Sequence, residues 1–381
     1  RWTAMKSWIP KHWLSVRNLL RQARGARGRM SGDVAQTSGV VLADAAMIKE
    51  AAGVIKRGGL VAFPTETVYG LGADATNTHA VATLFQVKGR PKFDPLIVHV
   101  ASKEEACGLW AHCPDMTHRL MEAFWPGPLT LVLPKNERIP DLVTAGLSTV
   151  AVRMPDHPVA LELIRQAGCP IAAPSANRFG GVSPTTAQAV EEDLRTRLDV
   201  ILDAGPARIG IESTVVACER DTLVVLRPGG IPVEAIREVA GTVTVAHTNP
   251  AQPAAPGMLA RHYAPRTPLY LLDGLTNPRV RLGPVGMTTG RMGLLSFGPV
   301  IEPSGFTITE VLSHQGDLVE AAARLFQAIR RLDAEGLEAM VATQTPEHGL
   351  GLAIMDRLRK ASQGIALVAE GRLVLIDRST P

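Results

Sequence analysis

The stretch "LVAFPTETVYGLGADATNTHAVATLFQVKGRPKFDPLIVHV", residues 60–100, decides the fold of this chain. The apolar runs at 60–63 and 95–100 are typical of short buried strands, and Pro64 ends the first run. A helical pattern lies between them, with Thr78 as its predicted cap and Gly89 at its end. This order of strand, helix and strand favours an α/β fold. The residues just after Pro64 are rich in Thr, Glu, Tyr and Gly, and we predict a ligand-holding loop there.

The same alternation extends over residues 40–240, for which we predict one α/β or α+β domain with a mixed sheet. A helix with an apolar face precedes the opening stretch and ends at Gly58 and Gly59. Further helices are expected near 117–124, 158–167 and 186–195. Further strands are expected in the runs "LTLVLP", "TVAVRM", "PIAAP", "VILDAG", "STVVAC" and "TLVVLRP".

Residues 241–268 interrupt the pattern, because they contain five prolines and little apolar periodicity. We predict a linker there, although its "HYAP" is unusual for a passive tether. A second α/β unit is predicted over 269–381. Its expected strands are "PLYLL", "MGLLSF" and "LEAMVAT", and its expected helices are "DLVEAAARLFQAIRRLDAEG" and "GLGLAIMDRLRKAS".

The first 29 residues differ in kind from the rest, with eight Lys or Arg and no Asp or Glu. One interpretation is an organellar transit peptide, which is Arg-rich and acid-poor. The other is an extension upstream of a natural start at Met30, and we favour this second interpretation. Either way, the segment is excluded from the fold prediction. The predicted location is cytoplasmic, or organellar if the segment is a genuine transit peptide.

The net charge of +4 becomes about −4 when the eight cations of residues 1–29 are removed, so the excess of cations typical of an RNA-binding surface is missing. No apolar run reaches the roughly 18 residues that a membrane span requires. The cysteines Cys107, Cys113, Cys169 and Cys218 form no C-x-x-C pair and no zinc spacing. We predict reduced, partly buried thiols, and we expect His112 and His118 to be surface or cap residues.

Five apolar runs lead into short polar clusters: "FPTET", "VAVRMP", "AAPSAN", "GIESTVV" and "VVLRPGG". Ligands of α/β sheets bind at strand ends, so one shared pocket explains the five clusters better than chance does. Cations adjoin the clusters, and guanidinium groups bind phosphate and carboxylate in bidentate fashion. The sequence has no phosphate-binding P-loop, dinucleotide fingerprint, nucleophile elbow or zinc-protease helix. We therefore expect catalysis by positioning and charge neutralisation.

These residues resemble the YrdC-type threonylcarbamoyl-AMP synthases in their longer two-domain form. The motifs "FPTETVYGLGADA", "KGRP", "PLIVHV", "WPGPLTLVL", "VAVRMPDHP", "APSAN", "SPTTA", "ESTVV", "LRPGG" and "HYAP" stand in that family's order over about 46–268. The resemblance implies a twisted mixed sheet with flanking helices and an open concave pocket, followed by a smaller Rossmann-like domain. It also implies a nucleotidyltransferase that converts L-threonine, bicarbonate and ATP, with Mg²⁺, to threonylcarbamoyl-adenylate and pyrophosphate.

By this resemblance, a threonine pocket would be formed by Thr67, His99, Arg153, Ser175 and Ser213. The nucleotide would be bound by Lys88, Arg90, Asp94, Thr149, Asn177, Thr185, Arg227, His262 and Tyr263. Asp94 departs from the family, which often carries Asn there, so its role stays open. The linker would fold over the pocket, with His262 and Tyr263 as a lid. No protein nucleophile and no protein-held metal are implied.

The product would pass to a partner transferase that modifies adenosine beside the anticodon of certain tRNAs, so contact with tRNA would be indirect. Two alternatives stay open at this point. One is a binding module for double-stranded RNA. The other is the carbamoyl-adenylate domain of hydrogenase maturation factors, although the acylphosphatase and paired-cysteine segments of those proteins are missing here.

Overall fold

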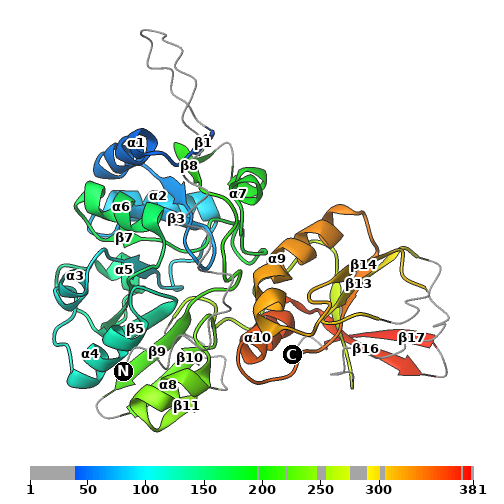
Figure 1. Cartoon of the computed structure of the whole chain (residues 1–381). Coiled ribbons are helices and arrows are strands. Elements are labelled where there is room, and N and C mark those ends of the chain that lie inside the picture. Colours follow the sequence, from blue (N-terminus) through cyan, green and yellow to red (C-terminus); the bar gives the residue numbers. More distant parts are fainter. Residues whose placement is uncertain are drawn as a thin grey trace, which may run out of the picture. The chain divides into compact units, whose positions relative to one another are not determined.

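A computed structural model describes residues 39–194, 197–219, 222–246, 255–274, 290–300, 305–369 and 372–378. The predicted extension at 1–29 and part of the predicted linker lie outside these ranges. Two sheets with associated helices confirm the predicted α/β class (Figure 1). The domain bounds at 40–240, 241–268 and 269–381 stay predictions.

The larger sheet has eleven strands in the order β1-β8-β2-β3-β7-β4-β6-β5-β9-β10-β11 and mixes parallel with antiparallel pairs. Every strand that the sequence predicted in this region is present. The strands are β1 Val40–Leu42, β2 Val61–Phe63, β3 Gly70–Asp74, β4 Ile97–His99, β5 Leu129–Pro134, β6 Thr149–Arg153, β7 Ile171–Ala172, β8 Val200–Asp203, β9 Thr214–Glu219, β10 Thr222–Arg227 and β11 Val243–Val245.

Strand β3 corrects one prediction, because it occupies residues that the sequence suggested to be loop. The segment between β2 and β3 is a tight buried connection, and β3 pairs antiparallel with β2 and β7. Gly72 makes this pairing possible. A Cβ at Gly72 would lie only 2.8 Å from the Phe63 ring and 2.9 Å from Ile171. The glycines therefore permit close packing of the strand, whereas their low strand propensity hides it from the sequence.

The helices of this domain are α1 Ala45–Lys56, α2 Thr78–Lys88, α3 Lys103–Cys107, α4 Asp115–Phe124, α5 Asp141–Thr144, α6 Pro158–Ala167, α7 Ala187–Leu194 and α8 Val233–Ala240. The cap of α2 is Asn77, not Thr78 as predicted. The Asn77 side chain accepts hydrogen bonds from the backbone amides of His79 at 3.0 Å and Ala80 at 3.2 Å. Gly89 ends α2 in the left-handed conformation, as predicted.

The alternation of side chains along each strand divides the core between the two faces of the larger sheet. In β2, Val61 and Phe63 pack with α1 and α6, whereas Ala62 packs on the opposite face with helices that include α2, α4 and α7. The face that α1 and α6 cover continues across β4, β6, β5 and β9. There Ala255 and Met258 of the linker pack against apolar strand residues. The linker thus covers part of the face that those two helices leave open.

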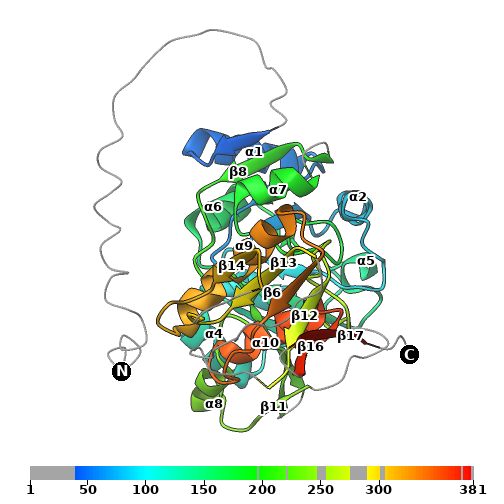
Figure 2. The ribbon, with the colours of Figure 1, turned by 90° about the vertical axis from the view of Figure 1, so that its right-hand side faces the viewer.

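The smaller sheet has the order β14-β13-β15-β12-β16-β17, parallel except for β17. Its strands are β12 Leu269–Leu272, β13 Met292–Ser296, β14 Ile308–Val311, β15 Ala339–Ala342, β16 Gly364–Ala369 and β17 Arg372–Asp377, and its helices are α9 Leu318–Ala334 and α10 Gly351–Ala361. Both helices pack on one face of this sheet (Figure 2). The core on that face also includes Val68, Ile211 and Tyr263. No helix among the described residues is long and apolar enough to cross a membrane.

Candidate functional site

The site begins at the carboxyl ends of two parallel strands. His99 is the last residue of β4 and Arg153 is the last residue of β6, and the two are register partners. Neighbouring residues in register point to the same face of a sheet, here the face on which the linker packs. Strand ends at a sheet's carboxyl edge are the usual location of ligands in α/β folds.

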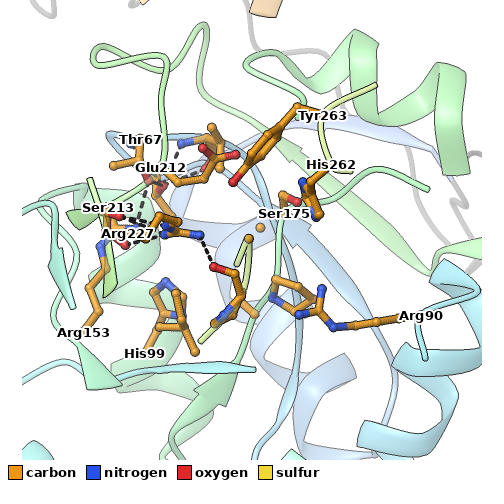
Figure 3. A pocket seen from close by; sticks show the side chains of 18 residues that line it. Thr67, Arg90, His99, Arg153, Ser175, Glu212, Ser213, Arg227, His262 and Tyr263 are labelled. Atoms are coloured by element: carbon orange, nitrogen blue, oxygen red, sulfur yellow. Dashed lines mark hydrogen bonds between the residues drawn. The ribbon is translucent and has the colours of Figure 1, made fainter. Parts of the chain in front are cut away.

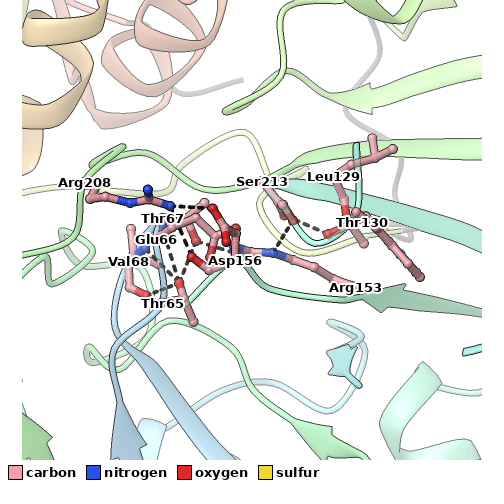
Figure 4. Close-up of polar contacts among 12 residues, drawn as sticks. Thr65, Glu66, Thr67, Val68, Leu129, Thr130, Arg153, Asp156, Arg208 and Ser213 are labelled. Carbon is pink, nitrogen blue, oxygen red and sulfur yellow. Dashed lines mark hydrogen bonds and ion pairs between the residues drawn. The ribbon is translucent and has the colours of Figure 1, made fainter. Parts of the chain in front are cut away.

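The connection between β2 and β3 contacts Arg153 through two side chains (Figure 4). Arg153 Nη1 donates to Thr67 Oγ1 at 2.9 Å. Arg153 Nη2 forms an ion pair with Glu66 Oε1 at 2.7 Å. Both side chains are almost fully buried. Glu66 and Thr67 therefore fix the orientation of the Arg153 guanidinium group, which lines the pocket.

Ser213 and Arg227 form the next part of the wall. Arg227 Nε and Nη2 donate to the Ser213 carbonyl at 3.2 and 2.9 Å, and Nη1 donates to the Pro256 carbonyl at 2.9 Å. The Ser213 hydroxyl forms a hydrogen bond of 2.7 Å with the Thr130 hydroxyl. Arg227 thus fastens the linker to the site through Pro256.

The linker brings His262 and Tyr263 into the site, and both are buried. Their rings meet edge to face at 4.1 Å between centroids, and Tyr263 stacks on Phe326 of α9 at 5.6 Å. Tyr263 has a φ of 61°, an unfavourable left-handed conformation for a bulky residue. His262 Nδ1 and Tyr263 Oη have no hydrogen-bond partner among the described residues. The fold therefore holds a strained segment in place with its polar atoms unsatisfied.

Together these elements line a pocket of about 520 Å³ that opens to solvent (Figure 3). All five predicted threonine-binding residues line it: Thr67, His99, Arg153, Ser175 and Ser213. Of the predicted nucleotide-binding residues, Arg90, Arg227, His262 and Tyr263 line it. The lining contains three guanidinium groups and one carboxylate, that of Glu212, so it fits an anionic ligand.

Five predicted nucleotide-binding residues do not line this pocket: Lys88, Asp94, Thr149, Asn177 and Thr185. The ammonium group of Lys88 is buried and donates to the backbone carbonyls of Ser175 and Asn177, so it holds one wall of the pocket. Asp94 is buried 2.9 Å from Arg90 in an ion pair. Thr149 begins β6 opposite Pro134.

Burial sets the protonation of the histidines. The pKa of His99 is lowered to about 3, first by burial and then by the charge of Arg153. Burial also lowers the pKa of His262 well below its usual value, and Arg90, Lys88 and Arg227 add to the effect. Both imidazoles are therefore neutral near pH 7. Burial raises the pKa of the Tyr263 hydroxyl, which stays protonated and can donate.

Comparisons with known proteins match this architecture over most of the chain. The Sua5_yciO_yrdC family model, described as "Telomere recombination", matches residues 53–229. A model described as "Threonylcarbamoyl-AMP synthase, C-terminal domain" matches residues 231–363. The threonylcarbamoyl-AMP synthase of Pyrococcus abyssi is 45% identical over 334 residues, which are 83% of this chain and 94% of that protein. The chain belongs to the threonylcarbamoyl-AMP synthase family.

Two further similarities agree with this membership. The threonylcarbamoyl-AMP synthase of Bacillus subtilis is 44% identical over 322 residues, covering 83% of this chain and 93% of that protein. The crystal structure of Pyrococcus abyssi Sua5 complexed with L-threonine superposes with a TM-score of 0.77 at 39% identity, covering 87% of this chain and 98% of that one. The predicted family, fold and enzyme class are confirmed, and the synthase is favoured over an RNA-binding module or a hydrogenase maturation domain.

Sequence reasoning missed three charged residues of this synthase-family site: Glu66, Glu212 and Arg357. Both carboxylates stand inside predicted clusters, "FPTET" and "GIESTVV". A glutamate among Thr and Ser residues could have identified each of them as a site residue. Arg357 of α10 is fully buried and donates to Glu212 Oε2 at 2.8 Å and to the Pro228 carbonyl at 2.8 Å. The sequence indicated Arg357 less clearly. It lies four residues from both Ala353 and Ala361, and therefore on the apolar face of the helix.

Proposed function

We propose that this chain condenses L-threonine, bicarbonate and ATP to threonylcarbamoyl-adenylate and pyrophosphate. The observation that carries the proposal is the pocket lined by the guanidinium groups of Arg90, Arg153 and Arg227, with Glu212 as its one lining carboxylate. One guanidinium group suits the carboxylate of an amino acid. The others suit the phosphates of a nucleotide.

At the threonine end, Arg153 binds the substrate carboxylate. Glu66 and Thr67 fix the orientation of the guanidinium group, which lowers the entropy lost on binding. The hydroxyls of Thr67, Ser175 and Ser213 contact the threonine hydroxyl or the carbamate. Neutral His99 lines the same pocket, and its Nδ1 has no hydrogen-bond partner in the part of the chain that the structure describes. Because a site built to bond a hydroxyl rejects an analogue without it, valine should be a poor substrate.

At the nucleotide end, Arg90 and Arg227 neutralise phosphate charge, and His262 and Tyr263 cover the nucleotide. Lys88 acts by holding the backbone of Ser175 and Asn177 in place. Asp94, Thr149, Asn177 and Thr185 belong to the nucleotide's surroundings in this proposal, although they do not line the pocket. Asp94 acts by orienting Arg90, from which it is 2.9 Å away.

The reaction needs no protein nucleophile. The threonine amine and bicarbonate give a carbamate with loss of water, and a carbamate oxygen then attacks the α-phosphorus while pyrophosphate leaves. The cationic lining lowers the repulsion between the two anions and stabilises the charge that develops on the phosphates. The one lining carboxylate, Glu212, is engaged by Ser183 and Arg357, so the lining fits Mg²⁺ that arrives on the triphosphate rather than an ion held by protein ligands. Such an ion supplies additional charge neutralisation to the phosphates.

The adenylate is a mixed anhydride that water destroys, so it must pass quickly to a consumer. We propose a downstream transferase that modifies tRNA, with only indirect contact between this chain and tRNA. The proposed location is cytoplasmic, or organellar if residues 1–29 act as a transit peptide. Fluorescent fusions with and without residues 1–29 would distinguish the two locations.

The deciding experiment measures pyrophosphate release from ATP and Mg²⁺, with L-threonine and bicarbonate omitted in turn. Release that needs both substrates, with threonylcarbamoyl-adenylate identified by mass spectrometry, would support the proposal. Valine in place of threonine is the matched control and should give little release. Release indifferent to threonine would indicate another acceptor. Salt-sensitive tRNA binding without any release would favour a binding role instead.

A further inference from the structure

A cluster of three metal-ligating side chains lies outside the pocket. Cys107 is the last residue of α3, Cys113 directly precedes the Pro114 cap of α4, and His118 lies in α4. One ligand atom from each residue, the two Sγ atoms and an imidazole nitrogen, lie within 4.8 Å of one another. The sequence suggested no zinc spacing, because C-x5-C-x4-H is not a familiar pattern and only the fold brings its three donors together.

The backbone between the two cysteines is held in place by the neighbouring strand end. The Ala111 amide donates to the Pro134 carbonyl at 2.9 Å, and the Asn136 amide donates to the Leu109 carbonyl at 3.0 Å. The Asn136 side chain also donates to the Gly108 carbonyl at 2.5 Å. The two sulfurs are thus brought together by a fixed loop, and a site with fixed ligands binds a metal with less loss of entropy.

The three donors have no competing partners among the described residues. Each thiol's hydrogen-bond partner is the other thiol, at 3.0 Å between the Sγ atoms, and the His118 imidazole has none. Both cysteines are half-buried while His118 is exposed, so the cluster is open to solvent on the histidine side. A metal ion can enter from that side, and a water molecule can complete its coordination.

We propose that Cys107, Cys113 and His118 bind a thiophilic metal ion of the Zn²⁺ class. Two thiolates and one neutral imidazole are typical zinc ligands, and water would fill the fourth tetrahedral position. Tetrahedral zinc with bonds of about 2.3 Å places two sulfurs about 3.8 Å apart. The two Sγ atoms therefore need to separate by only about 0.8 Å from their 3.0 Å distance, which small side-chain rotations provide.

The rival fate of the pair is a disulfide bond between Cys107 and Cys113. A disulfide would consume both thiols and leave no thiolate for the ion, so the test must also exclude it. None of the three ligands lines the pocket, so the ion would connect α3 to α4 and stabilise the fold rather than take part in the synthase reaction.

The test uses the full chain, purified under reducing conditions, stripped with a chelator and titrated with Zn²⁺. We expect about one tightly bound zinc per chain. Co²⁺, added as a spectroscopic probe, should show the visible absorption of thiolate coordination. Zn²⁺ should also raise the thermal midpoint, because it binds the folded state preferentially.

Cys107→Ser and His118→Ala should weaken zinc binding by about tenfold or more and abolish the Co²⁺ signal or shift it. Cys169→Ser and His79→Ala are the matched controls, since Cys169 is outside the cluster and His79 is an exposed helical histidine. Because His118 is exposed, His118→Ala should fold even if a cysteine variant does not. Equal zinc binding in the ligand variants and the controls would overturn the proposal. So would peptide mapping that finds a Cys107–Cys113 disulfide in the native protein.

Discussion

Arg357 and Glu212 form a buried ion pair between residues 145 positions apart in the chain. Arg357 Nε donates to Glu212 Oε2 at 2.8 Å, and the side chains are 0% and 8% exposed. The Arg357 guanidinium also lies 5.2 Å from the centroid of the Tyr263 ring. One residue of α10 thus contacts both a pocket-lining carboxylate and the linker tyrosine. The pair connects the smaller sheet's helices to the site.

Arg357→Met should destabilise the protein by about 3–5 kcal/mol, because it leaves the Glu212 carboxylate buried without its partner. Burial alone would raise the pKa of Glu212, but the charges of Arg357 and Arg227 hold it below its usual value. Loss of Arg357 should therefore raise that pKa. Urea unfolding at pH 7 measures the change in free energy.

The matched control is Arg359→Met, two residues along the same helix. Arg359 pairs with Glu347, but both side chains are more than two-fifths exposed. Exposed pairs contribute about 0–1 kcal/mol, so the control should be nearly neutral. Arg357→Met combined with Glu212→Gln should lose less than the sum of the single changes, because neither charge is then left alone. Equal effects of Arg357→Met and Arg359→Met would contradict the importance of the buried pair.

Stability should fall as the pH drops from 7 toward 4, and His99 should account for part of the fall. The unfolded imidazole binds a proton below its usual pKa of about 6.5, whereas the folded one resists protonation down to about 3. The unfolded state therefore binds more protons in this window, and acid favours it by up to about 1.4 kcal/mol per pH unit.

His99→Gln should flatten this dependence in urea unfolding experiments between pH 7 and pH 4. The exposed His79→Gln should keep the slope of the original protein. If His99→Gln and His79→Gln show the same slope, the imidazole of His99 is not held neutral by burial.

The apolar runs allowed much of the larger sheet to be predicted from the sequence. Val61 and Phe63 alternate with Ala62 between two cores, and such alternation is visible in a sequence. Strand β3 escaped because Gly70 and Gly72 have low strand propensity, and only the approach of Phe63 explains them. Strands with alternating or continuous apolar residues could therefore be predicted from the sequence, whereas β3 depends on tertiary packing that no local pattern shows.

The pocket could be predicted from the polar clusters at the strand ends. How deeply each of its charged residues is buried could not be predicted. Lys88 reads as a phosphate ligand from "KGRP", yet its ammonium group donates to two backbone carbonyls behind the wall. Arg357 stands in helical register with Ala353 and Ala361, but only the structure shows that it is fully buried and paired with Glu212. In both cases the sequence shows a charge, and only the fold shows which group satisfies it.

Arg153→Ala should weaken L-threonine binding by roughly 10- to 100-fold, because a hydrogen bond to a charged group contributes about 1.5–3 kcal/mol. Calorimetric titration of L-threonine in the absence of nucleotide measures the change. Arg165→Ala is the control, since the Arg165 side chain is 55% exposed on α6. Unchanged threonine affinity in folded Arg153→Ala protein would mean that Arg153 does not bind the threonine carboxylate.

His262→Ala and Tyr263→Ala should reduce the yield of adenylate more than they reduce threonine affinity. Both residues lie on the linker over the pocket, and a lid acts by excluding water from a reactive intermediate. Mass spectrometric yield of threonylcarbamoyl-adenylate, compared with threonine affinity, measures the difference. An unchanged yield in both variants would exclude a lid function for this segment.

Gly257→Ala should disturb the lid formed by His262 and Tyr263, because Gly257 lies against Tyr263. Gly257 has a φ of 79°, and a Cβ there would lie 2.5 Å from Tyr263 Oη and 3.1 Å from Arg227 Cδ. The added methyl group must displace Tyr263 or the linker backbone, so adenylate yield should fall while threonine affinity changes little. The two measurements are those used for Tyr263→Ala.

Gly146→Ala separates this contact from backbone strain. Gly146 has the same φ of 79°, but a Cβ there meets nothing within 4 Å. Both substitutions carry the left-handed backbone penalty of about 1 kcal/mol or more, and only Gly257→Ala adds a collision with Tyr263. A larger loss of yield in Gly257→Ala is therefore due to the displaced tyrosine. Equal yields in the two variants would mean that the position of Tyr263 does not limit adenylate formation.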